Sequence, residues 1–174
     1  MTRYFILPGL GNSGEDHWQT HFEQSGENFT RINQQNWNTP DCNEWIETID
    51  KTVQSEALEN VVLVGHSLAC TTIAFWASTY GRVIKGALLV APSDIESAVY
   101  KFQATGFEPI PLNPFSFKTI VVGSTNDPWV TIERAQFFAK QWNSEFINIG
   151  TAGHINTEAG YGPWAEGLEI LRRI

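Results

Sequence analysis

Six short apolar runs recur along this chain, and segments with helical patterning separate several of them. A short apolar run bounded by turn residues is typical of a strand buried on both faces, and alternation of such strands with helices favours a parallel sheet. We therefore predict an α/β fold with about six mainly parallel strands and helices on both faces. The strands are expected at residues 4–7, 30–32, 61–64, 87–90, 119–122 and 146–149, of which the second is the shortest and the most polar.

Three segments are expected to form helices, and two of them show amphipathic periodicity. The first begins at Asp41, whose carboxylate can cap a helix with one apolar face made of Trp45, Ile46, Ile49 and Val53. A second stripe runs from 130 to 142, and a last helix is expected from about 163 to the end. The proline-rich segment 109–114 fits neither a regular helix nor a central strand, so we expect a surface loop there. Little length is left for an inserted cap, and we expect one domain over 1–174.

The chain contains 11 Lys and Arg against 19 Asp and Glu, a formal net charge of −8. This shortage of positive charge argues against binding to nucleic acid or to anionic lipid surfaces. The first residues lack the apolar stretch of a secretory signal, and no run approaches the roughly 18 apolar residues of a membrane-spanning helix. Cys42 and Cys70 are expected to be free thiols in a reducing compartment. We therefore expect a cytoplasmic protein with no nucleic-acid or membrane partner.

Side chains with complementary chemistry follow three of the predicted strands. Ser67 follows the third strand, Asp127 the fifth and His154 the sixth. The carboxyl ends of parallel strands meet at one edge of a sheet, and a serine, an acid and a histidine in this chain order are typical of the α/β-hydrolase triad. We predict Ser67 as nucleophile, His154 as general base and Asp127 as the residue that orients the base. Asp94, after the fourth strand, is the alternative acid, and Asp127 could instead cap the following helix.

The segment around Ser67 has the composition of a nucleophile elbow, a tight strand-to-helix turn that exposes a catalytic hydroxyl. Gly65 stands two residues before the serine, where the strand and helix backbones nearly touch. Ala69 stands two residues after it, where glycine is more usual, and is small enough for the same contact. His66 belongs to the turn itself and is not expected to act as the base. Outside a triad, Ser67 would be an ordinary serine at the start of a helix.

A serine nucleophile also needs donors for the oxyanion, and two backbone N–H groups are expected to provide them. One belongs to Leu68, directly after the nucleophile, and the other to Leu10, in the glycine-containing loop after the first strand. Three tryptophans flank the predicted site loops, where they either line an apolar acyl pocket or pack as core and rim residues. They are Trp18, Trp129 and Trp164.

Two motifs suggest cofactors, and neither is complete. Residues 9–14 spell Gly-Leu-Gly-Asn-Ser-Gly, the dinucleotide-binding pattern, but residues 33–36 after the second predicted strand are Asn-Gln-Gln-Asn, without the carboxylate that would hold a ribose. His17 and His21 have the i, i+4 spacing of metal ligands, yet no Glu-x-x-His pattern accompanies them. We therefore expect no metal and no cofactor.

Given these motifs, the sequence resembles the RBBP9/YdeN family of small serine hydrolases over nearly its whole length. The shared motifs are Pro8-Gly9-Leu10-Gly11-Asn12-Ser13 with Asp16-His17-Trp18, Gly65-His66-Ser67-Leu68, Gly123-Ser124-Thr125-Asn126-Asp127-Pro128, Ala152-Gly153-His154-Ile155-Asn156 and Gly160-Tyr161-Gly162-Pro163-Trp164. The resemblance implies a compact α/β-hydrolase core that lacks the first strands of larger relatives, with neither a cap domain nor a cofactor. It also implies a triad of Ser67, Asp127 and His154, and indicates the reaction type rather than the substrate.

Together, the residues and the resemblance predict a serine hydrolase that acts on small ester-like substrates through an acyl-enzyme intermediate. Carboxylesters, thioesters and amides are the substrate classes that fit. A site without a cap is expected to be shallow and to favour small or extended substrates. The alternative is a protein-interaction module with an idle triad; no sequence feature indicates a protein partner, and a scaffold has no need of all three residues at strand ends.

Overall fold

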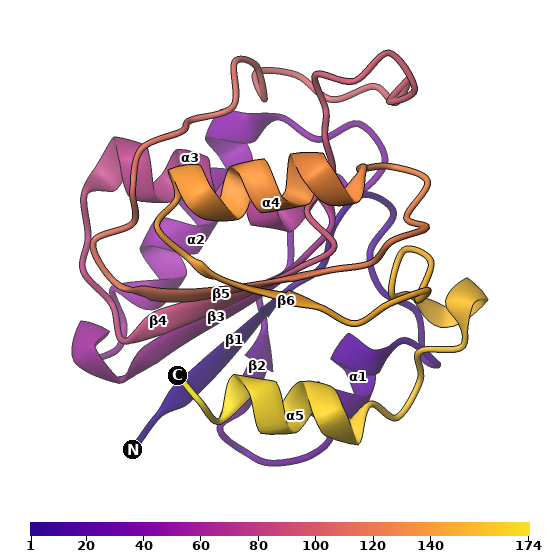
Figure 1. Ribbon diagram of the computed structural model, residues 1–174. Coiled ribbons are helices and arrows are strands. Elements are labelled where there is room, and N and C mark those ends of the chain that lie inside the picture. The colour runs from indigo at the N-terminus through magenta and orange to yellow at the C-terminus, as the bar shows by residue number, and fades with distance from the viewer.

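The sheet contains six strands in the order β2-β1-β3-β4-β5-β6, and every neighbouring pair is parallel. A computed structural model describes all 174 residues of the chain (Figure 1). The strand bounds are Arg3–Leu7 for β1, Phe29–Arg31 for β2, Val61–His66 for β3, Gly86–Val90 for β4, Lys118–Gly123 for β5 and Glu145–Asn148 for β6. Each of the six predicted runs overlaps one of these strands, so the prediction of a parallel α/β architecture is confirmed.

Burial explains why the central strands are apolar without alternation. Every residue of β3 and β4 is buried, because both faces of the sheet are covered by helices. The edge strands β2 and β6 contain no fully buried residue, and their sequences are correspondingly more polar. A strand with two covered faces needs apolar side chains at every position, whereas an edge strand tolerates polar ones.

Helices cover both faces of the sheet, in two separate groups (Figure 1). The first group is α2 (Cys42–Val53), α3 (Leu68–Tyr80) and α4 (Ile132–Gln141), and the second is α1 (Trp18–Glu23) and α5 (Ala165–Leu171). Two single-turn 3-10 helices span Leu58–Asn60 and Thr157–Ala159. This arrangement gives the sheet helices on both faces, as predicted.

Capping side chains determine where the helices begin. Asp41 caps α2 as predicted, because its Oδ1 accepts hydrogen bonds from the N–H groups of Asn43 at 2.9 Å and Glu44 at 3.2 Å. The start of α4 differs from the prediction of residue 130, since Thr131 is the cap and accepts from the Arg134 N–H at 3.2 Å. The last helix is also shorter than predicted, ending at Leu171.

Each face of the sheet has its own apolar core. The larger core lies beneath α2, α3 and α4 and contains 30 buried residues, among them Trp45, Trp76 and Trp142. The smaller lies beneath α1 and α5 and contains 15. There the rings of Trp18 and Trp164 meet edge to face with centroids 5.3 Å apart, and Trp18 Nε1 donates a hydrogen bond to the Ile155 carbonyl oxygen at 2.8 Å. Edge-to-face contacts of this kind add to the stabilisation from burial.

The connection between β4 and β5, residues 91–117, contains neither helix nor strand. Apolar side chains anchor it to the larger core; they are Ile95, Phe107, Ile110, Phe115 and Phe117. Its beginning is held by Arg134 on α4, whose Nε lies 3.0 Å from Asp94 Oδ2 and whose Nη2 lies 2.5 Å from Glu96 Oε2. The proline-rich part at 109–114 is irregular, as predicted. The connection therefore packs against the sheet layers and does not form a separate cap.

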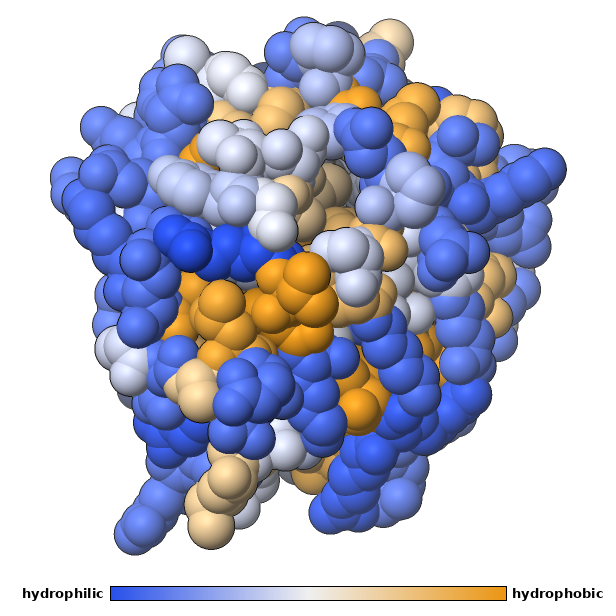
Figure 2. All heavy atoms as spheres, turned by 90° about the vertical axis from the view of Figure 1, so that its left-hand side faces the viewer, coloured by the Kyte–Doolittle hydropathy of each residue, from blue (hydrophilic) through white to orange (hydrophobic).

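The face at the amino ends of the strands lies opposite the predicted site residues. Figure 2 shows this face as mostly hydrophilic, with one group of apolar residues near its centre. Ser67, Asp127 and His154 all follow the carboxyl ends of their strands, at the other edge of the sheet. No helix combines the length and the apolar character that a membrane crossing requires.

At Gly9, the loop after β1 approaches the start of α3. A Cβ atom at this position would lie 2.8 Å from the His66 carbonyl oxygen, 2.9 Å from Ser67 Cβ and 3.1 Å from the Leu68 nitrogen. These neighbours are backbone atoms and a Cβ, so rotation of a side chain cannot relieve the overlap. Gly9 therefore allows the loop backbone to pack against the turn at Ser67. This packing explains the glycine without a dinucleotide-binding role.

Substitution of Gly9 by alanine should disturb this contact, whereas the same change at Gly14 should not. We expect Gly9→Ala to lower the free energy of unfolding by about 1–3 kcal/mol, the usual cost of overpacking. A Cβ at Gly14 would meet no atom within 4 Å, so Gly14→Ala should stay within about 0.5 kcal/mol of the wild type. Urea denaturation measures both values, and equal stabilities for the two variants would contradict the close approach at Gly9.

Candidate active site

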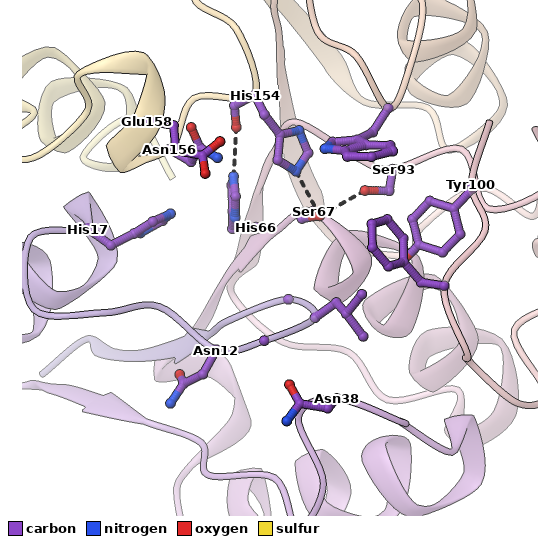
Figure 3. Close-up of a pocket in the computed structure, with 15 residues that line it drawn as sticks. Asn12, His17, Asn38, His66, Ser67, Ser93, Tyr100, His154, Asn156 and Glu158 are labelled. Atoms are coloured by element: carbon purple, nitrogen blue, oxygen red, sulfur yellow. Dashed lines mark hydrogen bonds between the residues drawn. The ribbon is translucent and has the colours of Figure 1, made fainter.

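Ser67 occupies the turn between β3 and α3 in a strained backbone conformation. Its φ of 59° and ψ of −124° belong to a region that costs a non-glycine residue about 1–3 kcal/mol. Its N–H donates a hydrogen bond to the Val90 carbonyl oxygen on β4 at 3.0 Å. The hydroxyl makes no capping hydrogen bond to α3, which removes the interpretation of Ser67 as an ordinary helix cap. It lies instead at the centre of a cleft (Figure 3).

Small residues on either side of Ser67 allow the strand and the helix to meet. A Cβ atom at Gly65 would lie 2.8 Å from Ile73 Cδ1 and 3.4 Å from the Ala69 carbonyl carbon. Ala69 itself is buried, and Ser67 keeps its positive φ beside it. The methyl group at position 69 therefore fits in a turn where glycine is more usual.

A continuous series of hydrogen bonds joins the three predicted residues. Ser67 Oγ lies 2.9 Å from His154 Nε2, and His154 Nδ1 lies 3.0 Å and 2.9 Å from the two carboxylate oxygens of Asp127 (Figure 3 shows the first of these contacts). These side chains come from the ends of β3, β6 and β5, so the parallel sheet brings together residues that are far apart in sequence.

Asp127, rather than Asp94, is the acid beside His154. The Asp127 side chain is fully buried, and its Oδ1 also accepts the Trp129 N–H at 2.9 Å. Asp94 pairs with Arg134, with 3.0 Å between Oδ2 and Nε. The expectation that Asp127 could cap α4 is wrong, because Thr131 takes that position.

Two polar residues that the sequence interpretation did not assign connect the loops of Asp127 and His154. Asn126 Oδ1 accepts hydrogen bonds from the Ser124 hydroxyl at 2.9 Å and from the Gly153 N–H at 2.7 Å. Ser124 Oγ in turn accepts the Ala152 N–H at 2.9 Å. These bonds hold the residue before His154 against the residue before Asp127. The position of Ser124 and Asn126 directly after β5, within the shared motif that also contains Asp127, was the sequence signal for this role.

His66 supports the backbone of His154. Its Nε2–H donates a hydrogen bond to the His154 carbonyl oxygen at 2.9 Å (Figure 3), and the two imidazole centroids lie 4.8 Å apart. Burial, reinforced by the neighbouring imidazoles of His154 and His17, holds the pKa of His66 well below its usual value. A neutral His66 remains a donor to this carbonyl, in agreement with the prediction that it does not act as the base.

His17 lies beside His66 and caps α1, rather than belonging to the helix as the i, i+4 spacing with His21 suggested. Its Nδ1 accepts the Gln19 N–H at 3.2 Å, and its ring centroid lies 4.8 Å from that of His66. Burial lowers the pKa of His17 to about 4, and the positive charge of Arg31 acts in the same direction. No group of three His, Cys, Asp or Glu side chains is arranged to hold a metal ion.

The cleft around Ser67 has a volume of about 480 Å³ and two chemically different walls. Tyr100, Phe102 and Trp129 form an aromatic wall, in which the Phe102 centroid lies 5.1 Å from each of the other two. The rest of the lining is mainly polar and includes Asn12, His17, Asn38, Asn156 and Glu158. Figure 3 shows Tyr100 on one side of Ser67 and His17, Asn156 and Glu158 on the other.

The three tryptophans were expected either to line an acyl pocket or to pack as core and rim residues, and the pocket role is wrong for two of them. Trp129 does line the cleft. Trp18 is fully buried and Trp164 nearly so, and both pack in the smaller core beneath α1 and α5. The physical reason is that α1 and α5 must bury an apolar face against the sheet, and these rings supply it.

The two backbone N–H groups predicted as oxyanion donors lie near Ser67. Leu68 begins α3, and the first N–H groups of a helix have no acceptor within the helix. Leu10 lines the cleft, and its N–H donates to no protein acceptor. The contact between Gly9 and Leu68 brings the loop of Leu10 against the helix start.

Ser93 is a further cleft residue that the sequence interpretation did not single out. Its Oγ lies 2.8 Å from Ser67 Oγ (Figure 3). Its position shortly after β4 gave a weak signal, because three other strands also deliver polar residues to this edge. Tyr100 and Phe102 were not predicted either, since they lie in an irregular connection without periodicity.

Comparisons with known proteins agree with this geometry. A family model described as serine hydrolase matches residues 4–173, and no curated protein matches the chain. A YdeN-like hydrolase from Pectobacterium atrosepticum is 33% identical, with a TM-score of 0.87 over 98% of this chain and 89% of that one. The ydeN gene product of B. subtilis (19% identity, TM-score 0.81, 99% and 98% covered) and ferulic-acid-bound Est1E from Butyrivibrio proteoclasticus (14%, 0.71, 98% and 85%) share the fold.

The buried state of His17 should make the protein less stable in mild acid. The unfolded chain protonates this imidazole near its ordinary pKa of 6.5, whereas the folded protein does so only near 4. The stabilisation is therefore complete above about pH 6.5 and decreases as pH falls towards 4. We expect His17→Asn, which can still cap α1, to reduce the slope of unfolding free energy against pH by up to about one proton. Urea denaturation between pH 7 and 4 measures the slope, and identical slopes would contradict the assignment.

Proposed function

This chain belongs to the serine hydrolase family, within the α/β-hydrolase superfamily, and we propose that it hydrolyses small ester-like substrates through an acyl-enzyme intermediate on Ser67. Carboxylesters are the proposed main class, with thioesters and amides as chemically related ones. His154 is the proposed general base and Asp127 the residue that orients it.

One observation supports this proposal most directly, the series of hydrogen bonds from the Asp127 carboxylate through His154 to Ser67 Oγ. The carboxylate can only accept, so His154 Nδ1 carries the proton and the neutral ring presents a lone pair at Nε2. That lone pair accepts the Ser67 hydroxyl proton. The tautomer required of a general base is therefore the one that Asp127 stabilises.

Acylation would begin when Ser67 Oγ attacks the substrate carbonyl carbon and His154 Nε2 takes the hydroxyl proton. The negative charge then develops on the former carbonyl oxygen, where the N–H groups of Leu10 and Leu68 are the proposed donors. His154 gives its proton to the leaving oxygen, sulfur or nitrogen as the acyl-enzyme forms. Water repeats the same steps to release the acid and restore Ser67.

The two walls of the cleft suggest how a substrate lies in it. We propose that the aromatic wall of Tyr100, Phe102 and Trp129 receives the apolar part of the substrate. The polar wall, with Asn156 and Glu158, would face its hydrophilic part or the solvent. A volume of about 480 Å³ suits a small substrate, or an extended one that continues beyond the cleft.

We also propose a cytoplasmic location and a small-molecule substrate, and two features of the whole chain support them. Cys42 and Cys70 are both free and buried, which agrees with a reducing compartment such as the cytoplasm. The net charge of −8 fits a small-molecule substrate better than a nucleic-acid partner.

A fluorophosphonate probe tests the activated serine. We expect one adduct per molecule on the wild type by intact mass, none on Ser67→Ala, and one on the control Ser116→Ala, which changes an exposed serine away from the cleft. Absence of the adduct on folded wild-type protein would contradict the proposal and favour a protein-interaction module with an idle triad.

Exchanging each of two carboxylates for an amide tests the role of Asp127. We expect Asp127→Asn to lower kcat for a chromogenic acetate ester by about 10⁴-fold, because the imidazole would adopt the wrong tautomer. Asp94→Asn removes only one partner of the half-buried Arg134 and should change kcat by less than about threefold. The reverse order of effects would assign the acid to Asp94.

A further inference from the structure

Ser93 is the second hydroxyl in contact with the nucleophile. Its Oγ lies 2.8 Å from Ser67 Oγ, and no other hydrogen bond is formed by its hydroxyl (Figure 3). The residue is fully buried, with an exposed fraction of 0%. Buried hydroxyl groups are normally hydrogen-bonded, and the only partner of the Ser93 hydroxyl is Ser67 Oγ.

The direction of this hydrogen bond follows from the rest of the series. In the neutral imidazole of a general base, Nδ1–H donates to Asp127, so His154 Nε2 accepts from the Ser67 hydroxyl. The single Ser67 proton is then used, so Ser67 can only accept from its other neighbour. Ser93 is therefore the donor, and the series runs from the Ser93 hydroxyl to the Asp127 carboxylate.

Two backbone hydrogen bonds hold the segment around Ser93. Ala91 has a φ of 50°, a positive value that is unusual for alanine, and its N–H donates to the Val122 carbonyl oxygen at 2.8 Å. The Asp94 N–H donates to the Trp129 carbonyl oxygen at 3.1 Å. Strained residues that the surrounding structure over-determines cluster at active sites, and Ser67 is another of them.

We propose that Ser93 is an additional catalytic residue that donates a hydrogen bond to the nucleophilic oxygen, an inference that rests on the proposed function of Ser67. Ser67 Oγ is bonded to its Cβ, gives its proton to His154 and accepts from Ser93, so one lone pair is left to attack the substrate carbon. Ser93 keeps its own proton throughout. Its hydrogen bond strengthens as negative charge builds on Ser67 Oγ during proton transfer to His154.

This role makes a specific kinetic prediction for Ser93→Ala. We expect kcat and the rate constant for fluorophosphonate labelling to fall about 10- to 100-fold, the effect of losing one hydrogen bond to a charged group. KM should change by less than about threefold, since the Ser93 side chain is fully buried and its hydroxyl is bonded to the nucleophile. Ser93→Thr retains the hydroxyl and should recover most of the labelling rate. Thermal unfolding of every variant reports whether the fold is preserved.

The outcomes separate this inference from the proposed function. No labelling of the wild type would overturn both. Labelling of the wild type and of folded Ser93→Ala at equal rates would overturn the role of Ser93 alone. Equal losses in the folded alanine and threonine variants would also overturn it, because the hydroxyl would then have no effect. If the alanine variant does not fold, Ser93→Cys replaces it, being close in size and a weaker donor, and should label at an intermediate rate.

Discussion

The hydrogen bond from the Ser67 N–H to the Val90 carbonyl oxygen joins the strained turn at the nucleophile to its neighbouring strand. It extends the pairing of β3 with β4, in which His66 lies opposite Val90. Strand β3 is fully buried and is paired with β1 on one side and β4 on the other. Relaxing the backbone at Ser67 would break hydrogen bonds of this pairing, so the pairing offsets the strain of the turn. The register of the sheet also determines where Gly9, Ser93, Asp127 and His154 leave their strands. The geometry of the site thus depends on strand pairing more than on any loop.

Most of the sheet could be predicted from the sequence, because buried parallel strands impose apolar runs that few other structures require. The helix boundaries were harder to predict from the sequence. Asp127 and Thr131 are both good caps, and the choice between them depends on whether the carboxylate is already used by His154. The packing of Trp18 and Trp164 was equally hard to predict from the sequence. They stand next to site motifs in the sequence, yet the direction of each ring depends on how α1 and α5 settle against the sheet.

The positions of Ser67, Asp127 and His154 could be inferred from chain order and from the ends of strands. The residues that surround these three side chains could not be inferred in this way. Ser93 contacts Ser67 and lies two residues after Ala91, whose φ is positive, and alanine gives no indication of such a conformation. Asn126 acts through two hydrogen bonds to separate segments, a role that any small polar residue after a strand could have. Residues that act through tertiary contacts leave no local pattern in the sequence.

The burial of His17 and His66 has a consequence for the end of the reaction. The proposed hydrolysis of an ester would leave a carboxylate inside the cleft, where a positively charged neighbour would retain it. Both imidazoles are neutral near pH 7, no lysine or arginine lines the cleft, and Glu158 adds negative charge to its wall. The acid product of the proposed reaction would therefore meet an electrostatic repulsion that a neutral ester would not. The cleft would therefore favour release of the acid. Because His17 and His66 are buried and neutral, we expect little inhibition by accumulated acid.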